Sequence, residues 1–128
     1  MGVLLTGPSG SGKSDLLLRL LSRGFSLVAD DRVEVTGLLA RPVATLAGLL
    51  EVRGLGIVRL SYEKEAVLAL AVELTRDTIR MPLPARHPVL DLPLLRLDPS
   101  APSAPEKVAL ALDCALGRTP QLAGAFAA

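Results

Sequence analysis

Eight residues near the start of the chain form a complete phosphate-binding motif, G-x-x-x-x-G-K-[ST]. The glycines let successive backbone N–H groups turn inward, where side chains would block the approach of a phosphate. The lysine would reach the β- and γ-phosphates of a nucleotide, and the final hydroxyl would ligate Mg²⁺. The motif therefore predicts a nucleotide and Mg²⁺ site formed by Gly7, Pro8, Ser9, Gly10, Ser11, Gly12, Lys13 and Ser14.

Two adjacent acids, Asp30 and Asp31, follow the next apolar segment after the motif. We expect that segment, residues 25–29, to be a strand, and ligands bind at the carboxyl ends of strands in open α/β sheets. One carboxylate could hold Mg²⁺ through water while its neighbour takes a proton from an attacking hydroxyl. The alternative is that both acids are helix caps or turn residues.

A further group of candidate residues lies in Glu51–Ile57. Glu51 could supply a metal ligand and Arg53 a clamp on phosphate charge, while Gly54 and Gly56 permit close backbone approach. On spacing alone, the favoured interpretation is a surface hairpin with an i, i+2 ion pair.

Composition narrows the class of protein. The 128 residues suffice for one domain with a core, and because aromatics are only 2% of them, Leu, Val and Ala must fill it. The net charge of +1 gives no electrostatic case for nucleic acid or an anionic membrane. No apolar run approaches the ~20 residues that cross a bilayer, so we expect a cytoplasmic protein. The single cysteine, Cys114, excludes an intrachain disulfide and is interpreted as a core thiol.

The phosphate-binding motif needs a strand before it and a helix after it. Val3–Thr6 is apolar and short, as a buried strand is, and leucines at helical spacing predict a helix over residues 12–23 that Gly24 ends. With a strand at residues 25–29, these elements would form a right-handed βαβ unit.

Short strands are predicted for much of the remaining chain. A capping box at Ser103–Glu106 predicts a helix to about Leu116, closed by Gly117, and the small residues 118–128 predict a frayed tail. The expected strands are hairpins at residues 33–36 with 38–42 and 49–53 with 57–60, a long strand at 66–74 and a short one at 92–97.

Three motifs occur in the order found in the catalytic domain of HPr kinase/phosphorylase, which this chain resembles. The phosphate loop of residues 7–14 is followed by A-D-D-R-V at 29–33 and by the family's E-[IV]-R-G-[LV]-G-I stretch at 51–57. Residues 92–108 are similar to the short alphaproteobacterial form. The resemblance implies an α/β fold over residues 1–117, a P-loop kinase domain akin to phosphoenolpyruvate carboxykinase, with a mixed β core and flanking helices.

The resemblance implies an ATP- and Mg²⁺-dependent kinase that phosphorylates a serine of the phosphocarrier HPr. Ser14 would ligate Mg²⁺ and Glu51 would be the second metal ligand. Asp31 would accept the proton of the serine hydroxyl, and Asp30 would support the metal or the base. With Lys13, Arg53 would hold the developing charge. Long members of the family are hexamers, which leaves a homo-oligomer open.

The family also carries a catalytic histidine shortly before the phosphate loop. Here only Met1 precedes Gly2, and the single histidine, His87, does not match it. Because the phosphorolysis loop also has no evident counterpart, we expect kinase rather than phosphorylase activity. Two other functions stay open: a nucleotide-binding regulator without catalysis, and a small-molecule kinase whose lid would use Arg76, Arg80 and Arg86.

Overall fold

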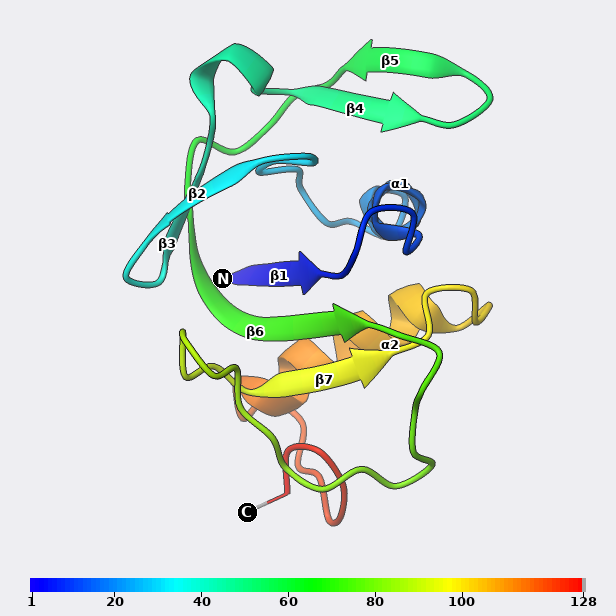
Figure 1. Cartoon of the computed structure of the whole chain (residues 1–128). Coiled ribbons are helices and arrows are strands. Elements are labelled where there is room, and N and C mark those ends of the chain that lie inside the picture. Colours follow the sequence, from blue (N-terminus) through cyan, green and yellow to red (C-terminus); the bar gives the residue numbers. More distant parts are fainter. Residues whose placement is uncertain (128) are drawn as a thin grey trace. The chain divides into compact units, whose positions relative to one another are not determined.

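The computed structural model describes residues 1–127, which carry both parallel and antiparallel strand pairs together with helices (Figure 1). The mixed β core predicted for an α/β protein is therefore confirmed. By contact density the chain forms two compact units, the first made of residues 1–13 with 68 onward and the second of residues 14–67. A single catalytic domain over residues 1–117 stays a prediction.

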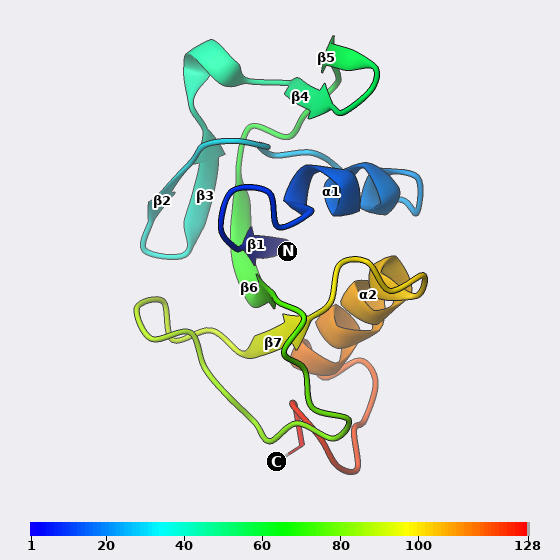
Figure 2. The same cartoon turned by 45° about the vertical axis from the view of Figure 1, so that its right-hand side comes forward.

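The first unit contains a parallel sheet with β6 in the middle. β1 (Gly2–Thr6) and β7 (Leu94–Leu97) pair in parallel with β6 (Ala66–Leu74). Leu70, Ala71 and Val72 have no exposed surface, as expected for an unbroken apolar strand covered on both faces. The helix α2 (Ala104–Ala115) runs along one face of this sheet (Figures 1 and 2).

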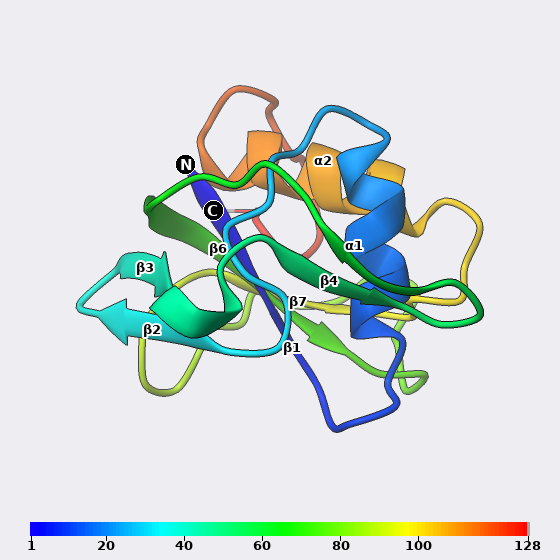
Figure 3. The same ribbon diagram turned by 90° about the horizontal axis from the view of Figure 1, so that it is seen from above.

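The second unit contains two antiparallel hairpins and most of a helix (Figure 3). Its core includes the buried leucines 16, 20, 27 and 50. β3 also pairs with the first two residues of β6, through Leu39 and Ala40. The elements are α1 (Lys13–Leu21), β2 (Val33–Thr36), β3 (Leu39–Pro42), the 3-10 turn η1 (Ala44–Leu46), β4 (Leu49–Val52) and β5 (Gly56–Arg59).

Most of the predicted elements are confirmed. The long strand has the predicted bounds, and both hairpins form, with Gly37 at φ 61° between β2 and β3. α1 ends two residues earlier than expected, and Gly24 at φ 93° follows as the left-handed residue. These features depend on local sequence, where glycine position and apolar periodicity are informative.

The strand predicted at residues 25–29 is wrong, and so is the βαβ unit that required it. This segment buries Leu27, whose carbonyl accepts one hydrogen bond from the Glu63 backbone N–H at 2.6 Å, but it forms no strand ladder. The parallel neighbour of β1 is instead β6, with Gly2 opposite Leu68. An apolar run marks burial, and burial here occurs without sheet pairing.

The capping box at the start of α2 is also wrong, although the helix itself is confirmed. Ser103 has φ −88° and ψ 8°, and its side chain makes no capping hydrogen bond. An N-cap side chain reaches the helix N–H groups from an extended backbone, which Ser103 does not have. The Ser103 carbonyl instead accepts a hydrogen bond from the Lys107 N–H at 2.9 Å.

The C-terminal segment folds back within the first unit. The Asp113 carbonyl accepts hydrogen bonds from the N–H groups of Arg118 and Thr119, and Ala125 is buried. Fraying of residues 118–128 concerns motion and stays a prediction. Cys114 is half-buried rather than part of the core, because it lines a cavity.

Neither helix found within residues 1–127 combines the length and apolar character that crossing a bilayer requires.

Candidate nucleotide site

The phosphate loop connects β1 to α1, as the motif predicts. β1 ends at Thr6, and α1 begins at Lys13. Between them the Ser11 N–H donates to the Pro8 carbonyl at 3.1 Å and closes a tight turn. Gly10 and Gly12 have φ angles of 80° and 94°, which side-chain-bearing residues rarely adopt. The loop therefore requires glycine at these positions for its backbone shape.

Packing within the first unit restricts two of the loop glycines further. A Cβ on Gly7 would lie 2.7 Å from Ser11 Oγ, and one on Gly12 would lie 3.3 Å from Pro99 Cγ. A Cβ on Gly10 would meet nothing within 4 Å. The backbone at Gly7 and Gly12 thus lies close to neighbouring side chains, whereas there is room for a side chain at Gly10.

The buried hydroxyl of Ser11 has no hydrogen-bond partner anywhere in residues 1–127. Buried polar groups in proteins are nearly always paired, so an orphaned donor calls for an explanation. A loop whose natural partner is an anion can leave a donor unpaired when no anion is bound. This hydroxyl therefore fits the phosphate group that the motif implies.

In the second unit, Asp30 contacts two of the predicted site residues. The Ser14 hydroxyl donates to Asp30 Oδ1 at 2.8 Å, and the Glu51 backbone N–H donates to Asp30 Oδ2 at 3.3 Å. The half-buried Asp30 carboxylate therefore links the first turn of α1 to β4. Asp30 does not follow a strand, and its oxygens do not cap a helix. Sequence analysis alone did not reveal this link, because 16 and 21 residues separate Asp30 from its two partners.

The remaining predicted residues are not joined by such contacts. Asp31 is exposed, and in the described part of the chain it makes no side-chain hydrogen bond or ion pair. The side chains of Glu51 and Arg53 are exposed as well. The hairpin interpretation of this stretch is confirmed, but no Glu51–Arg53 ion pair forms within residues 1–127. No group of three or more His, Cys, Asp or Glu residues suited to a metal was found there either.

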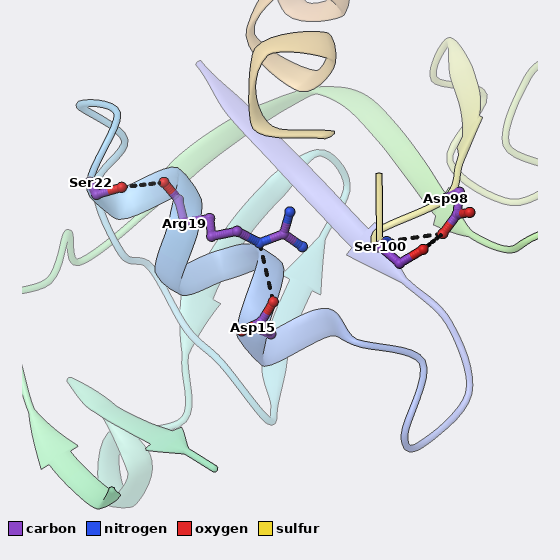
Figure 4. Close-up of polar contacts among 5 residues, drawn as sticks. All are labelled: Asp15, Arg19, Ser22, Asp98 and Ser100. Atoms are coloured by element: carbon purple, nitrogen blue, oxygen red, sulfur yellow. Dashed lines mark hydrogen bonds and ion pairs between the residues drawn. The ribbon is translucent and has the colours of Figure 1, made fainter. Parts of the chain in front are cut away.

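Contacts along α1 stabilise the helix that carries Ser14. Arg19 Nε lies 3.1 Å from Asp15 Oδ2, and the Ser22 hydroxyl donates to the Arg19 carbonyl at 2.7 Å (Figure 4). Asp15 lies in the first turn, where a negative charge interacts favourably with the helix dipole. An exposed i, i+4 ion pair contributes about 0.3–0.5 kcal/mol to helix stability.

The turn Asp98–Ser100 supports the phosphate loop through Pro99, and sequence reasoning missed it. The Ser100 hydroxyl and backbone N–H donate to Asp98 Oδ1 at 2.7 and 2.9 Å (Figure 4). These bonds, chiefly that of the hydroxyl, lower the pKa of Asp98, and the charges of Arg76 and Lys107 act in the same direction. The D-P-S sequence is a turn signal that could have located it.

Comparison with known proteins points to the same family and fold as the three sequence motifs. Residues 1–76 match the family model described as HPr Serine kinase C-terminal domain. The HPr kinase/phosphorylases of Xylella fastidiosa (strain M12) and Xanthomonas campestris pv. campestris (strain B100) are each 40% identical over an alignment of 121 residues. Each alignment covers 76% of this chain. The chain spans only 38% of the length of these relatives.

Among solved structures, the Hpr(Ser) kinase/phosphatase from Coxiella burnetii is similar with a TM-score of 0.74. The match covers 92% of this chain and 90% of that structure at 23% sequence identity. At this identity the match establishes the fold, and it agrees with the fold that the three motifs implied.

Proposed function

This chain belongs to the HPr serine kinase C-terminal domain family, and from that membership we propose that it is an ATP- and Mg²⁺-dependent kinase that phosphorylates a serine of the phosphocarrier HPr. The observation that carries the proposal is the hydrogen bond between Ser14, the last residue of the phosphate loop, and Asp30. A loop hydroxyl beside a carboxylate is the pair that holds Mg²⁺ in P-loop enzymes.

The phosphate loop would bind the nucleotide through its backbone. The positive φ angles of Gly10 and Gly12 and the start of α1 at Lys13 support this, because such a loop would present N–H donors beside the positive end of the helix dipole. Lys13 would add a point charge on the β- and γ-phosphates. The unpaired Ser11 hydroxyl supports this assignment, because it offers a further donor in the same loop.

Oxygen ligands for Mg²⁺ would come from Ser14 and Asp30, with Glu51 as the second acidic ligand. Mg²⁺ prefers a few protein oxygens, with water and phosphate oxygens completing the octahedron, so a large acidic cluster is not required. When bound, the ion neutralises charge on the phosphates. The Glu51 N–H on Asp30 Oδ2 supports this set, because it fixes the carboxylate that faces Ser14.

Asp31 would act as the base. A carboxylate oxygen of Asp31 takes the proton of the serine hydroxyl as the serine oxygen bonds to the γ-phosphorus and the bond to the bridging oxygen breaks. Its exposure and its lack of a side-chain partner in residues 1–127 leave it accessible to a protein substrate. Lys13 and Arg53 would stabilise charge on the transferred group.

A small-molecule kinase is less well supported. Arg86, one of three arginines available for a lid, pairs with Asp91 at 2.6 Å within its own turn.

Three narrower expectations stay part of the proposal: a cytoplasmic location, no nucleic-acid partner and a homo-oligomer. The cytoplasmic location rests on the lack of a long apolar run in the sequence. The expectation of no nucleic-acid partner rests on the near-neutral net charge.

The test is transfer of labelled phosphate from ATP to HPr by this chain. We expect label on wild-type HPr and none on HPr whose target serine is changed to alanine. Transfer to neither form, with ATP bound, would contradict the kinase assignment and favour a non-catalytic nucleotide-binding regulator. Label on both forms would contradict the assigned serine.

A further inference from the structure

A cavity of about 500 Å³ lies within the first unit. It is bordered by residues 78–82, by β7 with Asp98, by α2 and by residues 121–126. The loop after β6 and the C-terminal segment, which form two of its walls, lie side by side in both views (Figures 1 and 2). Small-molecule sites typically have volumes of ~300–1,000 Å³, so the cavity is large enough for a compact organic molecule.

Much of the cavity lining is apolar. Leu97 and Ala111 are buried beneath it, whereas Ile79, Met81 and Leu110 line it with exposed fractions of 73%, 61% and 56%. Large apolar side chains gathered at one concave surface are a feature of ligand sites. The lining would therefore cover the hydrocarbon part of a ligand.

Positive charge dominates the polar groups of the same lining. Arg96 is paired with Glu73 at 2.7 Å, and the one lining acid, Asp98, accepts two hydrogen bonds from Ser100. Arg80 and Lys107 have no side-chain hydrogen bond or ion pair within residues 1–127, apart from the through-space effect of Lys107 on Asp98. Two cations thus remain available to an anionic group.

We propose that this cavity binds a small organic carboxylate with an apolar body, with Arg80 and Lys107 holding the carboxylate and the lining around Leu110 covering the hydrocarbon. Arginine and lysine both pair with carboxylates through charge-assisted hydrogen bonds, which exceed neutral ones in strength. The site is independent of the proposed kinase activity, since none of its residues is assigned to ATP, Mg²⁺ or phosphate transfer.

Cys114 offers a direct readout of occupancy, because it is the only cysteine in the chain and it lines the cavity. The experiment measures the rate at which N-ethylmaleimide, a neutral reagent, modifies the intact chain with and without octanoate. We expect octanoate to slow modification by about tenfold at concentrations near ten times its Kd, because the rate follows the unliganded fraction. Acetate lacks the apolar body and octanamide lacks the charge, so both should protect far less.

Charge-removing variants separate the proposed site from general effects. The double variant Arg80→Gln with Lys107→Gln should raise the Kd of octanoate, read from its protection of Cys114, by about tenfold. Arg59→Gln, which removes an exposed arginine outside the cavity, should leave this Kd unchanged. Each comparison uses the ratio of rates with and without octanoate, so a changed thiol reactivity cancels. Lys107→Gln alone is the second variant if the double variant unfolds.

Calorimetric titration of octanoate into the same proteins provides a measurement that involves no thiol. The proposal is overturned if octanoate neither protects Cys114 nor gives a binding heat, if octanamide protects equally, or if the double variant binds like wild type. Because neither readout uses ATP or HPr, failure of this proposal is distinguishable from failure of the kinase proposal.

Discussion

The two units of this chain carry their proposed functional residues on different kinds of backbone. In the first, the phosphate loop follows a strand whose parallel partner, β6, has completely buried residues at its centre. In the second, the E-x-R-G-x-G-I stretch forms a hairpin whose Leu55 and Ile57 are 75% and 70% exposed. Rigid packing suits the binding of an invariant phosphate group, whereas an exposed hairpin suits contact with a partner.

The largest expected effect is that of Lys13→Ala. We expect phosphate transfer to fall by about 1,000-fold or more and ATP binding to weaken, because the Lys13 charge would lie against the phosphates in both the bound and the reacting state. Transfer rate and ATP affinity measured on one preparation check this. An unchanged ATP affinity would break the assignment of binding to the first unit.

Asp31→Asn should separate chemistry from binding. Loss of the proposed base should lower transfer by about 100- to 1,000-fold while ATP affinity and thermal stability stay at wild-type values, because Asp31 is exposed and its side chain makes no hydrogen bond or ion pair in the described chain. Asp30→Asn is the matched control, because it alters the carboxylate bonded to Ser14 and should also change the Mg²⁺ dependence. A fully active Asp31→Asn protein would end the base assignment.

The contrast in burial predicts a contrast in stability. Leu70→Ala removes a fully buried side chain and should lower the free energy of unfolding by about 3 kcal/mol, within the ~2–5 kcal/mol range for such changes. Ile57→Ala removes an exposed one and should cost less than about 0.5 kcal/mol. Urea unfolding of the two variants tests this, and equal losses would show that the hairpin is as firmly packed as the sheet.

The smallest effect concerns the turn behind Gly12. The Asp98 pKa is lowered in the folded state, so the stabilisation is present above its usual value of 3.8 and is lost as pH falls through the lower folded pKa. Ser100→Ala removes the hydroxyl donor, so its stability deficit should be present at pH 7 and shrink towards pH 3. Unfolding curves at both pH values check this. If the stability deficit of Ser100→Ala grew as the pH fell, the hydrogen bond to the Asp98 carboxylate would not be its cause.

Features encoded by neighbouring residues could be predicted from the sequence. The phosphate loop, both hairpins and the bounds of β6 follow from glycine spacing and apolar runs. The failures share a different cause. Residues 25–29 have the composition of a strand, but pairing depends on which other segment reaches β1, and that segment lies far along the chain.

The candidate site shows the same division. The motif located the residues of the phosphate loop, but it could not show which acid approaches Ser14, because a hydroxyl–carboxylate contact depends on how a loop turns. The capping box predicted at Ser103 is a related case. The residues of the motif are present, but the backbone at Ser103 is not extended, so its side chain does not cap the helix. The cavity is formed by four separate segments, so no single stretch of sequence predicts it.

The register of β1 against β6 has a consequence for folding order. Gly2 pairs with Leu68, a separation of 68 − 2 = 66 positions, whereas Thr36 and Leu39 of the β2–β3 hairpin are three positions apart. Closing the longer loop costs more chain entropy, so short-range pairings form sooner. Because β1 and the phosphate loop precede β6 in the chain, the loop gains the sheet pairing beside it only after β6 has left the ribosome.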